Sequence, residues 1–257
     1  MGDSTLRAVL LDLDGVLYIG NQAIEGAQQS VLRLKQAGYA LAGVTNTTTM
    51  PRRSIAEKLA SMDIPLSREQ LFTPAAAACR LIGRRSAKLY VRPELLEDFS
   101  EVRMDPDHPE FVLMGDIGGE GYPPETLREI FLHVMDGARL LALHKNRFWQ
   151  KPDGLHLDVG CFVSAVEYAA NTEATVLGKP SRDFFLALCS QLAVQPEACL
   201  MVGDDIESDI LGAQKAGMKT ALVKTGKYRE AFVRKCGIRA DLVLPSIADL
   251  PDAMQLL

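Results

Sequence analysis

Two aspartates, Asp12 and Asp14, directly follow a continuous apolar run over residues 8–11. Such a run is typical of a parallel strand that is buried on both faces, so Asp12 is predicted at the carboxyl end of a buried strand. Gly15 permits the chain to bend there, which would let both carboxylates serve one site. A solvated turn would explain the pair alone, but the apolar run before it and the glycine after it favour a functional pair.

Three further polar clusters lie near the expected ends of other strands. They are Thr45-Asn46-Thr47, Gly178-Lys179-Pro180 and Gly203-Asp204-Asp205. A hydroxyl, an amide and an ammonium group are all suited to holding phosphate oxygens. In an open parallel sheet, ligands bind outside the carboxyl ends of the strands, so the four clusters are predicted to meet in one crevice.

Each cluster by itself also has an ordinary structural explanation. Thr45 and Asn46 could cap a helix, and Lys179 could be a solvated lysine at a helix entrance. The two aspartates of the third cluster, together with Asp209, could complement the positive end of a helix. It is the combination of the clusters that indicates a shared chemistry.

Several acids combined with one lysine are what phosphoryl transfer to an aspartate requires. An aspartate that attacks a phosphate meets like-charge repulsion of about 4 kcal/mol per pair of unit charges at 4 Å and an effective dielectric of 20. A divalent cation and an ammonium group would offset that repulsion. Carboxylate oxygens are hard ligands that fit Mg²⁺ rather than Zn²⁺. The sequence supplies both the acids for a cation and the lysine.

The elements that would position these clusters alternate between short apolar runs and helix-like stretches. Predicted strands cover residues 8–11, 39–44, 174–177, 199–202, 220–223 and 242–244. Predicted helices cover residues 23–37, 51–62, 181–192 and a stretch that ends at Gly217. This alternation predicts an α/β fold with a doubly wound, Rossmann-like parallel sheet that has helices on both faces.

The middle of the chain breaks this rhythm. Its predicted strands cover 89–93, 111–114 and 140–143, its predicted helices 124–135 and 163–170, and a polar loop is predicted over 146–154. We assign these elements to an inserted α/β domain of ordinary size. The predicted organisation is a first core part over 1–83, the inserted domain over 84–173 and a second core part over 174–257.

Composition argues against several classes of function. The formal net charge of −5 disfavours nucleic acid as a partner, because binding to its backbone needs a basic face. No segment approaches the roughly 20 apolar residues of a membrane span, so no membrane partner is expected. The five cysteines are scattered, and the N-terminus offers no export signal, so the protein is predicted to be cytoplasmic.

Together the motifs resemble the haloacid dehalogenase (HAD) superfamily of phosphatases. The similarity is carried, in this order, by Asp12-x-Asp14-Gly-Val, Thr45-Asn, Gly-Lys179-Pro and Gly-Asp204-Asp205-x-x-x-Asp209. The long insertion between the second and third motifs resembles the subgroup with a large cap domain, which includes NagD-like, 4-nitrophenylphosphatase-like and pyridoxal phosphate phosphatases. The resemblance spans nearly the whole chain and implies a HAD core with an inserted cap.

The resemblance implies a Mg²⁺-dependent phosphatase that forms an aspartyl-phosphate on Asp12. Asp14 would protonate the leaving group and later activate water. Thr45, Asn46 and Lys179 would hold the phosphoryl oxygens of the substrate.

The resemblance also implies how Mg²⁺ would be bound. Its protein ligands would be Asp12, Asp204 and the backbone carbonyl of Asp14. Asp205 and Asp209 would support these ligands from outside the metal's immediate shell.

The implied cap would close over the crevice, exclude water and select the substrate. The loop over 147–151 and the turn over 158–161 are candidates for facing the site, and the four histidines lack a shared metal spacing and are interpreted as structural. The expected partner is a small phosphorylated molecule; sugar phosphates, nucleotides, pyridoxal phosphate, pyrophosphate and phosphoamino acids all stay open. A homodimer formed through the cap also fits the resemblance.

Three other functions compete with a phosphatase on these residues. A dehalogenase of the same fold uses the first aspartate but needs no acid two residues later, so Asp14 favours phosphate chemistry. A phosphomutase would return the phosphoryl group to the substrate, and a non-catalytic protein would only bind a phosphorylated ligand. A nucleotide-binding dehydrogenase is disfavoured because no G-x-G-x-x-G motif follows the first predicted strand.

Overall fold

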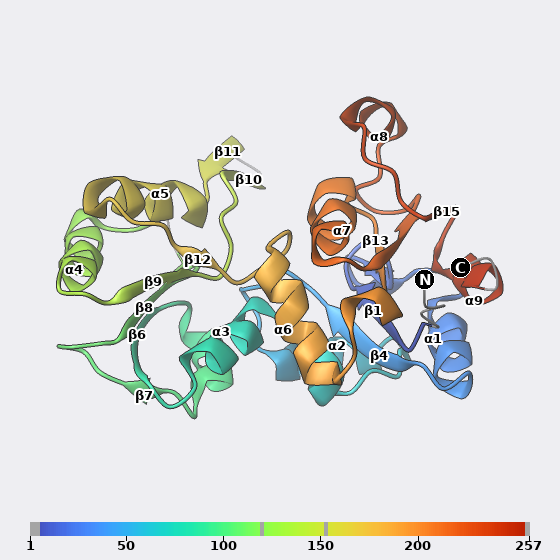
Figure 1. Cartoon of the computed structure of the whole chain (residues 1–257), viewed down its shortest axis with the longest axis horizontal. Coiled ribbons are helices and arrows are strands. Elements are labelled where there is room, and N and C mark those ends of the chain that lie inside the picture. The colour runs from blue at the N-terminus through green and yellow to red at the C-terminus, as the bar shows by residue number, and fades with distance from the viewer. Residues whose placement is uncertain (1–5, 119–120, 152–153, 255–257) are drawn as a thin grey trace. The chain divides into compact units, whose positions relative to one another are not determined.

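A computed structural model describes residues 6–118, 121–151 and 154–254, which form two compact units (Figure 1). Within the described chain, the first unit comprises the residues up to 45, residues 52–72 and the residues from 179 on. The second unit comprises residues 46–51 and 73–178. The predicted domain limits, with an inserted domain over 84–173, stay a prediction.

The first unit is built on a six-stranded parallel sheet. In spatial order its strands are β15 (Leu242–Leu244), β14 (Lys219–Val223), β13 (Cys199–Gly203), β1 (Ala8–Asp12), β4 (Ala40–Val44) and β5 (Leu71–Phe72). Every residue of β1 and β13 is buried, as expected for central strands covered on both faces. The strand order runs outward from β1 in both directions, so β1 and β13 flank the switch point at which such sheets bind ligands.

Helices surround this sheet (Figure 1). They are α1 (Ala27–Gln36), α2 (Arg52–Ala60), α6 (Arg182–Leu192), α7 (Gly212–Ala216), α8 (Glu230–Cys236) and α9 (Leu250–Ala253). Helix α1 buries Val31 and Leu34 and contacts β4, while α7 contacts β14 and continues a π-helical segment, Ile206–Leu211. The predicted α/β fold with a doubly wound parallel sheet is confirmed.

Short elements complete the first unit. Strands β2 (Tyr18–Ile19) and β3 (Gln22–Ala23) form a small antiparallel hairpin after β1. Turns of 3₁₀ helix in this unit cover Arg68–Gln70, Pro196–Ala198 and Ile247–Asp249.

The second unit has a parallel sheet of its own. In spatial order its strands are β12 (Thr175–Val176), β9 (Arg139–Ala142), β8 (Phe111–Met114), β6 (Ser86–Tyr90) and β7 (Arg103–Met104). Its helices are α3 (Pro74–Ile82), α4 (Pro124–Met135) and α5 (Val159–Ala170), with a 3₁₀ segment at Pro93–Phe99. Ile130 of α4 and Val163 of α5 pack with Val112 and Leu140 in one apolar core. The predicted helix over 124–135 is confirmed at the same limits.

The polar loop predicted over 146–154 is wrong, because most of this stretch belongs to a hairpin. Strand β10 (Phe148–Lys151) pairs antiparallel with β11 (Gly154–Leu157), and Phe148 faces Leu157 across the ladder. The apolar residues of this hairpin, among them Phe148, Leu155 and Leu157, are exposed, so the stretch lacks the buried apolar face by which a strand is recognised in a sequence. The sequence Pro152-Asp153-Gly154 is of a type that favours turns and was the available signal; residues 152–153 of the predicted loop lie outside the described residues.

The strand predicted over 174–177 exists, but its predicted place in the core sheet is wrong. Strand β12 pairs with β9 of the second sheet, with Thr175 beside Leu141 and Val176 beside Ala142. The apolar pattern predicts that a strand forms, but two parallel sheets in one chain offer it equivalent edges. Lys179 therefore does not follow a strand of the core sheet and reaches its position from the loop before α6.

No helix in the described part of the chain combines the length and the apolar character that a membrane crossing requires.

Candidate active site

The site in the first unit is built around Asp12, the last residue of β1. The four residues before it are fully buried, and its neighbours in the sheet are β13 on one side and β4 on the other. The backbone of Asp12 pairs with Val44, so Thr45 begins the loop beyond the adjacent strand end. The apolar run thus holds a carboxylate at the edge of the sheet where ligands of this fold class bind.

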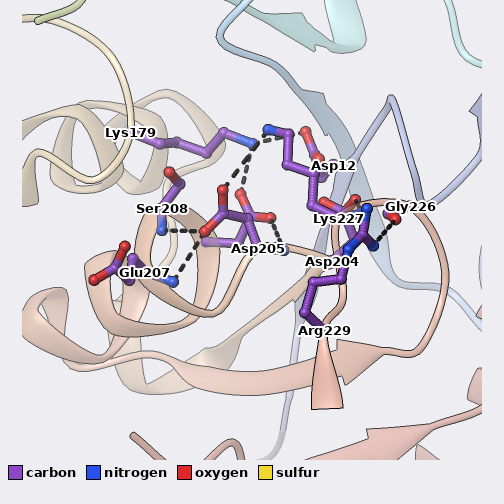
Figure 2. Close-up of polar contacts among 10 residues, drawn as sticks. Asp12, Lys179, Asp204, Asp205, Glu207, Ser208, Gly226, Lys227 and Arg229 are labelled. Atoms are coloured by element: carbon purple, nitrogen blue, oxygen red, sulfur yellow. Dashed lines mark hydrogen bonds and ion pairs between the residues drawn. The ribbon is translucent and has the colours of Figure 1, made fainter. Parts of the chain in front are cut away.

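Lys179 joins two of the carboxylates. Its Nζ donates to Asp12 Oδ1 at 2.6 Å and to Asp209 Oδ1 at 2.7 Å, and Figure 2 shows its side chain pointing toward Asp12. All three side chains are buried. Hydrogen bonds between charged groups at these distances are about twice as strong as neutral ones, so the ammonium group fixes the nucleophile candidate in one orientation.

Asp204, the residue after β13, has two oxygens in different situations. Its Oδ2 accepts a hydrogen bond from the backbone N–H of Lys227 at 2.6 Å. Its Oδ1 is buried and has no hydrogen-bond partner among the described residues. A buried carboxylate oxygen without a partner is costly, so a cation is the natural occupant of the space that it faces.

Asp209 supports the cluster from the turn that follows Asp204. Its Oδ1 accepts from Lys179, and its Oδ2 accepts from the backbone N–H of Asp205 at 3.1 Å. Gly203 lies against it, since a Cβ at that position would come closer than 3.0 Å to the Asp209 carboxylate. Both oxygens of Asp209 are therefore already engaged, which distinguishes it from Asp204.

Three buried carboxylates, those of Asp12, Asp204 and Asp209, lie close enough to hold one metal ion. Each offers an oxygen atom within 4.8 Å of the others. Among the described residues, only the ammonium group of Lys179 forms ion pairs with these three acids, and Lys227 acts on Asp204 more weakly, so negative charge remains in excess when all three are ionised. The all-oxygen donor set and the open Oδ1 of Asp204 fit a hard divalent cation such as Mg²⁺.

The proton affinities of the cluster reflect this imbalance. Burial raises the pKa of the Asp12 and Asp204 carboxyl groups, and it raises the pKa of Asp209 to about 6 although Lys179 opposes the change. For Lys179, burial by itself would lower the pKa, but Asp12 and Asp209 outweigh it and the pKa is raised. The lysine is therefore charged at neutral pH, and the acids gain from any added positive charge.

The remaining predicted residues occupy varied positions. Asp14 is exposed and forms a backbone bridge with Tyr18, and Thr45 is buried beyond β4. Asn46 belongs to the second unit, where it lies against Gly178. These positions do not test the roles that the resemblance assigns.

Asp205 has a local role as well as its predicted one. Its Oδ1 accepts hydrogen bonds from the backbone N–H groups of Glu207 and Ser208, each at 3.0 Å, as Figure 2 shows. It therefore caps the π-helical turn, and this geometry holds the turn that carries Asp209.

The loop after β14 is a part of the site to which the sequence pattern assigned no role. Lys227 donates its backbone N–H to Asp204, and Thr225 donates its hydroxyl to the carbonyl oxygen of Gly15. The position of this loop could have indicated its role, because it follows β14, the strand that pairs with the one ending at Gly203.

The second unit contains a cavity of about 440 Å³. Its lining combines the carboxyl groups of Asp116 and Asp158, the imidazole of His144, and the rings of Tyr122 and Phe162. The two rings lie 5.4 Å apart, and His144 Nε2 lies 3.9 Å from Asp158 Oδ1. Burial lowers the pKa of His144, so a residue interpreted as structural presents a neutral imidazole to a ligand-sized space.

Comparisons with known proteins agree with this fold and site. The sequence model of a family described as haloacid dehalogenase-like hydrolase matches residues 9–102, and one described as HAD-hydrolase-like matches residues 176–250. Haloacid dehalogenase-like hydrolase domain-containing protein 2 of Rattus norvegicus is 41% identical over 232 residues, which cover 90% of this chain and 88% of that protein.

Two further similarities cover almost the entire chain. Phospholysine phosphohistidine inorganic pyrophosphate phosphatase of Xenopus laevis is 36% identical over 258 residues, covering 97% of this chain and 94% of that protein. The structure of p-nitrophenyl phosphatase from Archaeoglobus fulgidus superposes with a TM-score of 0.87 at 23% identity, covering 97% of this chain and 99% of that one. At that identity the structural likeness concerns the fold alone.

Proposed function

The chain belongs to the haloacid dehalogenase-like hydrolase family and is a phosphatase, and we propose that it works with Mg²⁺ through an aspartyl-phosphate on Asp12. The proposal is carried by the buried contact of Lys179 with Asp12, at 2.6 Å, together with the buried Oδ1 of Asp204, which has no hydrogen-bond partner in the part of the chain that the structure describes. This arrangement offers a nucleophile, a fixed positive charge and a carboxylate oxygen that can bind a hard cation, all at one edge of the sheet.

In the first step, a carboxylate oxygen of Asp12 attacks the phosphorus atom of the substrate. The bond from phosphorus to the leaving-group oxygen breaks as the new bond forms, and Asp14 gives its proton to that oxygen. Asp14 is exposed two residues beyond the end of β1, so it can reach a group outside the cluster. General acid catalysis of this kind contributes about 10²–10⁴ in rate.

In the second step, water attacks the phosphorus atom of the aspartyl-phosphate. The Asp14 carboxylate takes a proton from the water, inorganic phosphate leaves, and the Asp12 carboxylate is restored. Lys179 stays charged throughout and holds the phosphoryl oxygens, as do Thr45 and Asn46 in this proposal. Each step therefore balances with substrate and water alone.

Asp12, Asp204 and the backbone carbonyl of Asp14 would hold Mg²⁺. When bound, the ion supplies charge that offsets the repulsion between the carboxylates and the phosphoryl oxygens. Asp209 keeps both oxygens on Lys179 and on the Asp205 N–H, so it orients the lysine rather than the metal.

For the substrate, we propose a small phosphorylated molecule that the second unit selects. Its cavity joins acidic groups to two aromatic rings, which suits an organic group with a polar or cationic end. One similar protein is named for phospholysine, phosphohistidine and inorganic pyrophosphate, so these three compounds come first in a substrate panel.

The test is turnover of an aryl phosphate and of that panel, with Mg²⁺ and after chelation. We expect Mg²⁺-dependent release of phosphate and a loss on the order of 10⁶-fold in Asp12→Asn, the scale seen when a covalent nucleophile is removed. Asp252→Asn, a change to an exposed acid of the same unit, serves as the matched control. Substantial activity in Asp12→Asn, or indifference to chelation, would refute the proposal.

A further inference from the structure

The loop after β14 contacts Asp204 on the oxygen that the proposed metal does not use. The Lys227 N–H binds Oδ2, whereas Oδ1 has no partner among the described residues. A carboxylate can rotate about its χ2 bond and exchange its two oxygens. A fixed donor on one oxygen removes that freedom and leaves the other oxygen available to a cation.

Two glycines close the space around the same oxygen. A Cβ at Gly15 or at Gly226 would lie closer than 3.0 Å to Asp204 Oδ2, and a Cβ at Gly226 would also lie 2.6 Å from the Cα of Gly15. Both glycines have positive φ, 93° and 55°. Side chains are thus excluded on both sides of the carboxylate, and only backbone can approach it so closely.

Two side chains hold the loop in place. The Thr225 hydroxyl donates to the carbonyl oxygen of Gly15, which ties the loop to the segment that carries Asp12 and Asp14. Arg229 donates to the carbonyl oxygen of Gly226 at 3.1 Å, a contact visible in Figure 2. The loop is therefore held at Thr225, which precedes the glycine, and at the carbonyl group of Gly226 itself.

We infer that the loop Thr225–Lys227 is a positioning element that sets the orientation of Asp204 and thereby the affinity of the first unit for Mg²⁺. The inference rests on the proposed metal site and names residues that act on it through Asp204. Gly226 lies against Asp204, and Thr225 bonds to Gly15, which lies against the same carboxylate. Both are therefore positioning residues that act through Asp204 and not on the reacting atoms.

The experiment measures Mg²⁺ binding to the full chain by titration calorimetry, without substrate. Gly226→Ala should weaken Mg²⁺ binding by about 10-fold or more, the range typical for groups that orient metal ligands. The matched control is Gly237→Ala, because Gly237 also has positive φ, 74°, but has open space where its Cβ would lie. That control should bind Mg²⁺ like the unchanged chain.

A second pair of variants keeps the inference testable if Gly226→Ala fails to fold. Thr225→Val removes the hydroxyl at nearly constant volume and should weaken Mg²⁺ binding, whereas Thr225→Ser keeps the hydroxyl and should restore most of the affinity. A general loss of packing would not follow the hydroxyl in this way.

The outcomes separate this inference from the proposed function. If the unchanged chain binds Mg²⁺ and both Gly226→Ala and Thr225→Val bind it equally well, the positioning role is overturned and the metal site stands. If the unchanged chain does not bind Mg²⁺, both proposals are wrong.

Discussion

The carboxylate cluster of the first unit and the cavity of the second unit present polar groups in opposite ways. In the cluster, Lys179 is buried and its Nζ lies within 2.7 Å of carboxylate oxygens of Asp12 and Asp209, so the geometry is fixed by ion pairs. In the cavity, His144 and Asp158 stand 3.9 Å apart beside aromatic rings, so the lining has room to adapt. The first arrangement suits one reaction, and the second suits the choice of a substrate.

The sequence predicts the residues of the carboxylate cluster but not the role of the cavity in the second unit. Asp12, Lys179, Asp204 and Asp209 were expected at one edge of a parallel sheet, and the structure brings their side chains together. Their types and their places after apolar runs suffice for that, because parallel strands end at a common edge. Their catalytic roles stay predictions.

Other features depend on contacts that a single sequence does not reveal. Strand β12 was placed in the wrong sheet because its apolar pattern fits either sheet equally well. The backbone N–H of Lys227 carries no signal in the sequence, since every residue but proline has one. Which oxygen of Asp204 stays open therefore required coordinates.

Among the predictions that compare the cluster with the cavity, the largest change in rate is expected at Asp14, the acid beside the cluster. Asp14→Asn should slow turnover by about 10²–10⁴, with the greater loss for poor leaving groups, because it removes the proposed proton donor. Rates are to be compared across aryl phosphates of different leaving-group pKa. An equal loss for all leaving groups would argue against Asp14 as the acid.

The next effect concerns the stability of the cluster. Lys179→Met should lower the free energy of unfolding by about 3–5 kcal/mol, since it leaves Asp12 and Asp209 buried without their cation. The loss should shrink as the pH falls toward 6, because Lys179 lowers the pKa of Asp209 and its removal lets protonation neutralise this carboxylate at a higher pH. Denaturant unfolding at several pH values measures this.

The control for that variant is Lys215→Met, which removes an exposed lysine of the same unit. It should change the free energy of unfolding little at any pH. Equal stability of the two variants would mean that the buried ion pairs do not organise the cluster.

A smaller effect follows from the pKa of Asp209. This pKa is about 6 in the folded, metal-free chain against an ordinary 3.8, so the folded state binds the proton more tightly than the unfolded one. The stabilisation is therefore fully present below pH 4 and is lost as the pH rises toward 6, by up to about 3 kcal/mol at this position.

Added Mg²⁺ should reverse that loss above pH 6 and have little effect near pH 4. Thermal unfolding with and without the ion, across this range, measures the difference. A Mg²⁺-induced stabilisation that is independent of pH would contradict the interpretation that the ionised carboxylates of the cluster lack compensating positive charge.

The smallest effect sharpens the role of the cavity. Phe162→Ala should raise KM by about 10-fold for a preferred organic substrate, the scale of a lost apolar contact, and leave Mg²⁺ affinity unchanged. Tyr168→Ala is the matched control, because Tyr168 is 92% exposed on the same helix, α5. A fall in kcat with constant KM would remove the cavity from substrate selection.

The most direct test of the central claim is to trap the phosphorylated enzyme. The variant Asp14→Asn is mixed with labelled substrate and Mg²⁺ and quenched in acid. The product of the first step, a hydroxylamine-labile phosphoryl group, should then be found on the peptide that contains Asp12. Label on Asp12 would establish the covalent route. Continued turnover by this variant without any labelled Asp12, or label on another residue, would contradict it.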